Sequence, residues 1–120
     1  MKVILLVGGH AETRQRLVDI LSVAGNQVLV AATGQEALEM APRLKPDLIL
    51  VAIVMPELNG VQTAAQMRNV AGYDNVPIYL LGRIPPLGIH DEPLSSLVNG
   101  YLSLDIRKDE LLAVVEQQRR

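Results

Sequence analysis

The sequence predicts an α/β domain in which helices cover both faces of a parallel sheet. Two segments, 3–7 and 48–54, are apolar at every position, as strands buried on both faces are. Stretches with apolar residues three or four positions apart lie between such segments, and this is the period of a helix packed on a core. Because strand and helix patterns alternate along the chain, we expect the strands to be parallel.

Three further segments complete the predicted sheet. Residues 78–81 form a third continuous apolar run, and the shorter runs 28–32 and 101–103 are the remaining strand candidates. The longest apolar run, 48–55, is far too short to cross a membrane. With 120 residues, the chain is long enough for one core and too short for two.

Four regular helices are predicted, each with its own boundary signal. The first should end at Gly25, and the second should begin after Thr33–Gly34 and stop near Pro42, because proline removes a backbone hydrogen bond and clashes with the preceding turn. The last should run on to the basic residues 119–120, whose charge suits the end of a helix. The apolar positions that mark the four helices are 17, 20, 21 and 24; 37, 38 and 41; 61, 64 and 67; and 111, 112 and 115.

The connection over residues 84–98 departs from this repeat. It contains three prolines and a glycine, which exclude a full-length helix. We expect a shortened, irregular helix of roughly two turns, capped by Asp91 or Glu92, with Pro93 in its first turn and Asn99–Gly100 at its end.

The composition argues against several functional classes. Thirteen acidic and eleven basic residues give a net charge of −2 at pH 7, which provides no general attraction to nucleic acid or to anionic lipid. The chain has no cysteine, so it forms no disulfide, thiol nucleophile or zinc–thiolate site, and His10 and His90 alone make no zinc site. We expect a soluble, cytoplasmic domain that binds neither DNA nor a membrane directly.

Residues 33–60 carry a more specific pattern. The segment Lys45-Pro-Asp-Leu-Ile-Leu-Val-Ala52, followed by Met55-Pro-Glu-Leu-Asn-Gly60, resembles the third strand and following loop of response regulator receiver (CheY-like) domains, and Thr33-Gly-Gln-Glu-Ala-Leu38 fits the same family. The resemblance keeps register over nearly the whole chain. It implies one flavodoxin-like (βα)5 domain over residues 1–120 with strand order 2-1-3-4-5, either alone or as the N-terminal part of a longer signalling protein.

The residues at the family's phosphorylation positions lack the side chains that its chemistry needs. Receivers use three carboxylates to hold Mg²⁺, one of which accepts the phosphoryl group, together with a lysine and a hydroxyl that stabilise the phosphoryl oxygens. By this resemblance the present chain has Gly8, Gly9, Ala52, Gly82 and Leu104 at those places. The sequence therefore predicts a degenerate pseudo-receiver that is not an enzyme, holds no Mg²⁺ and takes up no phosphoryl group.

Nearby side chains are not expected to restore the site. Glu12, Glu57 and Asp105 lie close to the missing positions in sequence, but a single displaced carboxylate makes a poor metal site. We expect the pocket to collapse, with Leu104 folding over the space left by the acids and gaining about 1.5–3 kcal/mol from apolar burial. The segment 8–10 is then a tight turn and not a phosphate cradle, since it lacks the further glycine and lysine of such motifs.

Four residues form the candidate interaction surface. Tyr101 occupies the position of the aromatic residue that, in the family, moves with a hydroxyl group when the domain is phosphorylated. Because position 82 is glycine and has no hydroxyl, we expect Tyr101 to be packed in one rotamer; the alternative is an exposed tyrosine at a protein interface. Pro85 and Pro86, in segment 84–98, are expected to shape a rigid docking surface, because proline lowers the entropy lost on binding. The alternative is that this segment has drifted after selection for switching was lost. Asp105 replaces the proline that follows the family's lysine.

These observations predict a phosphorylation-independent module for protein–protein interaction or dimerisation in signal transduction. Its partner would be another protein, an output domain of the same protein or a second copy of the chain, and no cofactor is expected. The alternative is a small-ligand-sensing domain that uses the vacated pocket, lined by Gly8, Gly9, His10, Ala52 and Gly82. An enzyme of another flavodoxin-like class has little support, since the strand ends carry no carboxylate pair.

Overall fold

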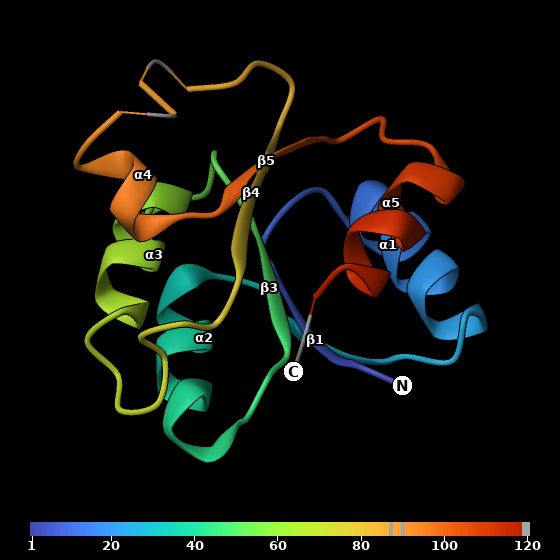
Figure 1. Cartoon of the computed structure of the whole chain (residues 1–120), viewed down its shortest axis with the longest axis horizontal. Helices are drawn as coiled ribbons and strands as arrows, with labels where there is room; N and C mark the ends of the chain where they lie inside the picture. The colour runs from blue at the N-terminus through green and yellow to red at the C-terminus, as the bar shows by residue number, and fades with distance from the viewer. Residues whose placement is uncertain (87, 90, 119–120) are drawn as a thin grey trace.

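A five-stranded parallel sheet forms the centre of the molecule (Figure 1). The computed structural model describes residues 1–86, 88–89 and 91–118. Every strand pairing is parallel and the strand order is β2-β1-β3-β4-β5, so the predicted fold class and order are confirmed. The strands are β1 (Val3–Val7), β2 (Gln27–Ala31), β3 (Leu48–Ala52), β4 (Ile78–Gly82) and β5 (Gly100–Ser103).

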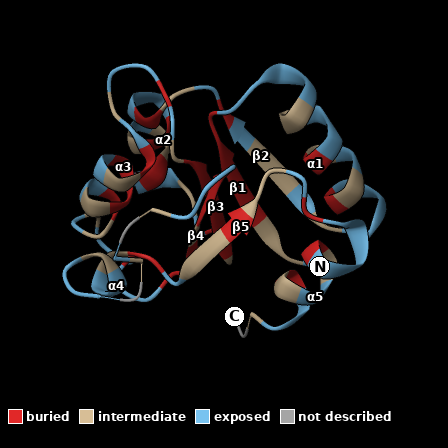
Figure 2. Ribbon diagram, turned by 90° about the horizontal axis from the view of Figure 1, so that it is seen from above, coloured by how far each residue is buried: buried red, intermediate tan, exposed pale blue. Residues whose placement is uncertain are grey.

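Alternate residues of the central strands β1, β3 and β4 enter two separate cores, one on each face of the sheet. In β1, Ile4 and Leu6 pack with residues of α1 and α5, whereas Leu5 and Val7 pack with residues of α2 and α3. Figure 2 shows this layering, with the buried residues on the central strands and on the inner sides of the helices. Both faces of the sheet are therefore covered, which explains why β1 and β3 are apolar at every position.

The helices largely follow the predicted boundaries. The first helix ends just before Gly25, which has φ +95°, and the second stops before Pro42, where the chain continues as a 3₁₀ turn. The last helix ends at Glu116, and the predicted basic end at 119–120 lies outside the described residues. No described helix is long and apolar enough to cross a membrane. The helical elements are α1 (Ala11–Val23), α2 (Gly34–Met40), η1 (Ala41–Arg43), α3 (Gly60–Met67), α4 (Leu94–Leu97) and α5 (Lys108–Glu116).

Strand β3 is two residues shorter than its apolar run predicts. The strand ends at Ala52 because the chain folds back on itself: the Gly60 amide donates to the Ile53 carbonyl at 2.9 Å. A Cβ atom at Gly60 would lie 2.9 Å from the Ile53 Cα and closer still to the Ala52 carbonyl oxygen, so only glycine permits this return. Glu57, in the same loop, has φ +67°, a left-handed conformation that is costly for a residue with a side chain.

Helix α4 is a single turn, shorter than the two turns predicted, and its expected cap is wrong. Pro93 lies before the first turn instead of within it, and neither Asp91 nor Glu92 caps the helix through its side chain. The helix stops early because the chain is drawn into the sheet. The Asn99 amide donates to the Ile78 carbonyl at 2.7 Å, and the Asn99 side chain accepts from the Ile78 amide at 2.9 Å.

Arg68, just after α3, connects the segments around this short helix. Its guanidinium donates to one side chain and four backbone carbonyls, and burial lowers its pKa from the usual value although the charge of Asp74 opposes the shift. An arginine remains charged under such a shift. The acceptors are the carbonyl oxygens of Leu97 (3.0 Å), Tyr73 (2.8 Å), Asp74 (3.3 Å) and Val76 (2.7 Å) and Oδ1 of Asn99 (3.3 Å).

Candidate functional site

The carboxyl ends of the parallel strands meet at one edge of the sheet, where open α/β domains bind their ligands. This edge lies below the loop that follows β4, at the top of Figure 1. Gly8 directly follows β1, and a Cβ atom there would lie 3.4 Å from the Cβ of Ala52 at the end of β3. Gly82 ends β4, and its carbonyl accepts from the Leu104 amide at 3.0 Å. The fold thus brings together the positions that the sequence singled out.

Met55 occupies the space in which a side chain at position 8 would begin. A Cβ atom on Gly8 would lie 2.8 Å from Met55 Cγ and closer still to its Sδ. Gly8 and Gly9 also have φ values of +73° and +88°, which L side chains rarely adopt. An aspartate at position 8 would therefore require both a strained backbone and a displaced methionine. The sequence contained no signal for this packing beyond the place of Met55 in the loop after β3.

Ile53 fills the corresponding space above Gly82. A Cβ atom at position 82 would lie 2.8 Å from Ile53 Cδ1 and 3.5 Å from a ring carbon of Tyr101. The half-buried Tyr101 donates its hydroxyl to the Gly82 carbonyl at 2.6 Å. The Tyr101 side chain is thus packed, as the sequence predicts, and the backbone of β4 serves as its hydrogen-bond acceptor.

Leu104 does not fold over the space left by the missing acids, so the prediction that it closes the pocket is wrong. The residue is half-buried and packs against the core beneath α1 and α5. An open hollow of about 920 Å³ remains at the edge of the sheet, with Leu104 in its wall. Met55 and Ile53 have taken the places nearest to Gly8 and Gly82, and the space above them is unfilled.

The hollow is mainly apolar and has a cationic rim. Its lining contains Arg83 and His10 but no aspartate or glutamate. Arg14 reaches the same edge, because its Nη1 atom donates to the carbonyl of Gly9, another lining residue, at 3.3 Å. Among the described residues, no three His, Asp or Glu side chains lie close enough together to hold a metal ion.

The other candidates lie around this edge. Pro85 is exposed and Pro86 is half-buried in the loop after β4, and Asp105 is exposed in the loop after β5. Glu12 and Glu57, which were considered as replacement ligands, are exposed and do not line the hollow. His90 lies outside the described residues.

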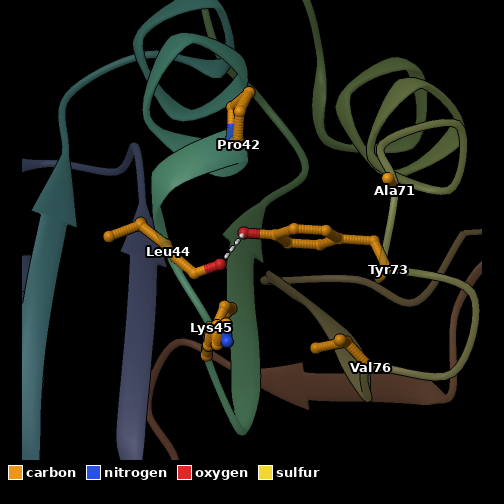
Figure 3. Close-up of a pocket in the computed structure, with 8 residues that line it drawn as sticks. Pro42, Leu44, Lys45, Ala71, Tyr73 and Val76 are labelled. Carbon is orange, nitrogen blue, oxygen red and sulfur yellow. Dashed lines mark hydrogen bonds between the residues drawn. The ribbon is translucent and has the colours of Figure 1, made fainter.

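A second, smaller hollow of about 250 Å³ lies at the opposite edge of the sheet, between η1 and the loop before β4 (Figure 3). Tyr73, only 2% exposed, donates its hydroxyl to the carbonyls of Ala41 at 2.8 Å and Leu44 at 3.3 Å. Burial raises the pKa of Tyr73. These bonds give Tyr73 a structural role, joining η1 to the α3–β4 loop.

The doubly wound parallel sheet, with strand order 2-1-3-4-5, defines a flavodoxin-like α/β domain. Within that class, the chain belongs to the response regulator receiver domain family, whose sequence profile matches residues 4–116.

Known relatives and solved structures agree with this assignment. The nitrate/nitrite response regulator NarL of Escherichia coli K12 is 30% identical, with 95% of this chain and 53% of NarL covered. Protein PilG of Pseudomonas aeruginosa is 27% identical, with 94% of this chain and 84% of PilG covered. The chain thus spans about half the length of NarL and most of PilG.

Two solved structures are especially informative. Vibrio cholerae chemotaxis protein CheY4 superposes with a TM-score of 0.90 at 26% identity, covering 99% of both chains. The receiver domain of the sensor histidine kinase PA1611 from P. aeruginosa, which has a magnesium ion coordinated in its active-site cleft, gives a TM-score of 0.86 at 26% identity, covering 98% of this chain and 96% of that one.

Proposed function

We propose that this receiver domain is a phosphorylation-independent pseudo-receiver that acts as a protein-interaction module in a signalling protein. The observation that carries the proposal is the occupation of the phosphorylation pocket by apolar groups. Ala52 ends β3 where the resemblance places the phosphoacceptor, and Met55 lies in the space above Gly8. This packing leaves the pocket without a carboxylate nucleophile and without room for a side chain at position 8.

The residues present do not fit Mg²⁺. This hard cation requires oxygen ligands in near-octahedral geometry and binds proteins through carboxylates. The lining of the hollow contains no aspartate or glutamate, and it includes the cation Arg83. Leu104 likewise supplies no charge to neutralise a transferring phosphoryl group. We therefore derive no phosphoryl-transfer step for this domain and propose that it has no catalytic activity.

Without phosphorylation, the domain would present the same surface to its partner at all times. The hydrogen bond from Tyr101 to the Gly82 carbonyl supports this idea, because it holds the aromatic side chain against the β4 backbone. We propose that the surface comprises α4, β5 and α5 together with Pro85, Pro86 and Asp105. It would bind another cytoplasmic protein, an output domain of the same protein, or a second copy of the chain.

The absence of phosphorylation is tested with a phosphodonor and a phosphoryl analogue. Incubation with acetyl phosphate and Mg²⁺ should add no phosphate by intact-mass spectrometry. Beryllofluoride with Mg²⁺ should leave the amide signals of Ala52 and Gly82 unmoved in two-dimensional NMR spectra. The receiver domain of PA1611, which coordinates a magnesium ion in its active-site cleft, serves as the positive control for Mg²⁺ binding. Uptake of phosphate, or Mg²⁺-dependent shifts at these two residues, would overturn the proposal.

The partner is addressed by measuring the mass of the purified chain in solution across a concentration series. A concentration-dependent dimer that is lost on Asp105→Arg substitution would identify a second copy as partner. Glu39→Arg, at an exposed position of α2 and outside the proposed surface, is the control charge reversal and should leave the dimer intact. A monomer throughout the series, unaffected by either change, would leave a different protein or an output domain as the partner.

A further inference from the structure

We propose that the open hollow at the carboxyl edge of the sheet binds a small amphiphile with an apolar body and one anionic group, such as a carboxylate or a sulfonate. This inference goes beyond the proposed interaction function and does not depend on it. It rests on the shape of the hollow, on the apolar side chains exposed at its mouth and on the sign of the charges around it.

The hollow has the size and lining of a small-molecule site. Its volume of about 920 Å³ falls in the range of ligand pockets, roughly 300–1,000 Å³. The inner lining is buried and apolar: Ala52 is 5% exposed, Met55 9% and Leu81 3%. An apolar body placed there would contact hydrocarbon and sulfur atoms on several sides. Met55 suits such a role, because its flexible thioether side chain adapts to ligands of different shape.

The mouth of the hollow presents apolar side chains to water. Val54 is 87% exposed and Ile84 is 78% exposed, and both belong to the lining. They follow two neighbouring strands, β3 and β4, and therefore flank one opening. Exposed apolar groups at the rim of an apolar hollow gain when a ligand covers them, because the ligand removes their surface from water.

The charges at the mouth favour an anion over a cation. Arg83 lines the hollow directly. Arg14 lies beside the hollow, because its side chain donates a hydrogen bond to the carbonyl of the lining residue Gly9. Guanidinium groups bind carboxylates, sulfonates and phosphates through paired, charge-assisted hydrogen bonds. Glu57 and Asp105 adjoin lining residues in the chain but do not themselves belong to the lining. A cationic head group would thus find no counter-charge in the hollow.

The proposal is tested with three probes below their micelle-forming concentrations: sodium decanoate, decylammonium chloride and 8-anilinonaphthalene-1-sulfonate. Decanoate should produce saturable NMR shifts centred on Ala52, Met55 and Gly82, with an affinity at least tenfold higher than that of decylammonium. The anilinonaphthalene sulfonate should gain fluorescence on binding, and decanoate should displace it. Vesicles of phosphatidylglycerol and phosphatidylcholine should leave the protein in solution, because the occupant is a free molecule.

Two substitutions on the exposed rim separate the roles of charge and apolar contact. Arg83→Gln should lower the affinity for decanoate at least fivefold and leave that for decylammonium within twofold. Val54→Asp should weaken decanoate at least tenfold and reverse the preference toward decylammonium. Val23→Asp is the matched control, since Val23 is 81% exposed near the far end of α1 and should change neither affinity. Unchanged circular dichroism spectra would verify that each variant is folded.

Several results would overturn the proposal. These are the absence of saturable shifts with decanoate, equal affinities for the anionic and cationic probes, or shifts spread over both cores. Sedimentation with vesicles that is lost in Val54→Asp would assign the rim to a membrane instead. A dimer of the free chain that Val54→Asp dissociates would assign it to a second copy.

Discussion

Replacing Gly8 by alanine should destabilise the domain more than the same replacement at the neighbouring Gly9. Both residues have positive φ values, +73° and +88°, so an alanine at either position costs about 1–2 kcal/mol of backbone strain. At position 8 the new Cβ atom also lies 2.8 Å from Met55 Cγ, whereas at position 9 no atom comes within 4 Å. Displacing a packed side chain costs roughly another 1–3 kcal/mol. We therefore expect about 2–5 kcal/mol for Gly8→Ala and about 1–2 kcal/mol for Gly9→Ala.

The free energy of unfolding is measured by urea denaturation, followed by far-ultraviolet circular dichroism because the chain has no tryptophan. Both substitutions are then repeated in a Met55→Ala background. With the methionine removed, the extra cost at position 8 should vanish, and the two substitutions should become equally destabilising. This double-mutant cycle isolates the contact between the two positions. The conclusion that Met55 fills the space above Gly8 would be refuted in either of two cases. Gly8→Ala and Gly9→Ala could destabilise the wild-type protein equally, or the extra cost of Gly8→Ala could persist without Met55.

Three further predictions concern individual side-chain hydrogen bonds, all measured by urea denaturation. Arg68→Met should cost about 2–3 kcal/mol, because it leaves several carbonyls without their charged donor, whereas Arg43→Gln at an exposed position should stay within about 0.5 kcal/mol. Tyr101→Phe should cost only about 0.5–1 kcal/mol, since the Gly82 carbonyl keeps its bond from the Leu104 amide. Burial raises the pKa of Tyr73, so folding favours its neutral form; this contribution to stability is complete below the normal tyrosine pKa of about 10 and is lost as the pH rises through the raised value. The free energy of unfolding of Tyr73→Phe should therefore decline less steeply above about pH 10 than that of the wild type.

The outcomes that contradict these predictions are specific to each residue. Equal effects of Arg68→Met and Arg43→Gln would show that the carbonyls around Arg68 are satisfied in another way. A cost above about 2 kcal/mol for Tyr101→Phe would mean that its hydroxyl contributes more than a second hydrogen bond to the Gly82 carbonyl. Parallel pH profiles of wild type and Tyr73→Phe would show that the alkaline loss of stability comes from groups other than Tyr73.

The elements of the sheet were predictable because their signals are local. A strand buried on both faces must be apolar at each position, and segment 3–7 meets that requirement over its whole length. Pro42 and Gly25 likewise act on their immediate neighbours, so the ends of α2 and α1 followed from the sequence. Helix α4 was harder to predict, since its end depends on hydrogen bonds between Asn99 and Ile78, which are 21 residues apart.

The shape of the site could be predicted only in part. The five degenerate positions could be found from their spacing along the sequence. They follow the carboxyl ends of parallel strands, and the fold brings these ends together at one edge of the sheet. Which side chains replace the lost ones depends on three-dimensional packing. Leu104 was expected to fill the pocket, yet it packs toward α1 and α5 and leaves that place to Met55. Nothing in the spacing of Met55 distinguishes a residue that folds over Gly8 from one that points to solvent.

The return of the chain at Gly60 makes the β3–α3 loop a closed ring of fixed length. One hydrogen bond, from the Gly60 amide to the Ile53 carbonyl, joins its two ends, and the capping box of Asn59 and Gln62 anchors one of them to α3. Met55 and Val54 both lie on this ring, so the floor and the rim of the hollow are mechanically coupled. A side chain at position 60 would push the ring open and move both together. A single glycine that does not itself line the hollow therefore sets the shape of the loop that forms part of its floor and rim.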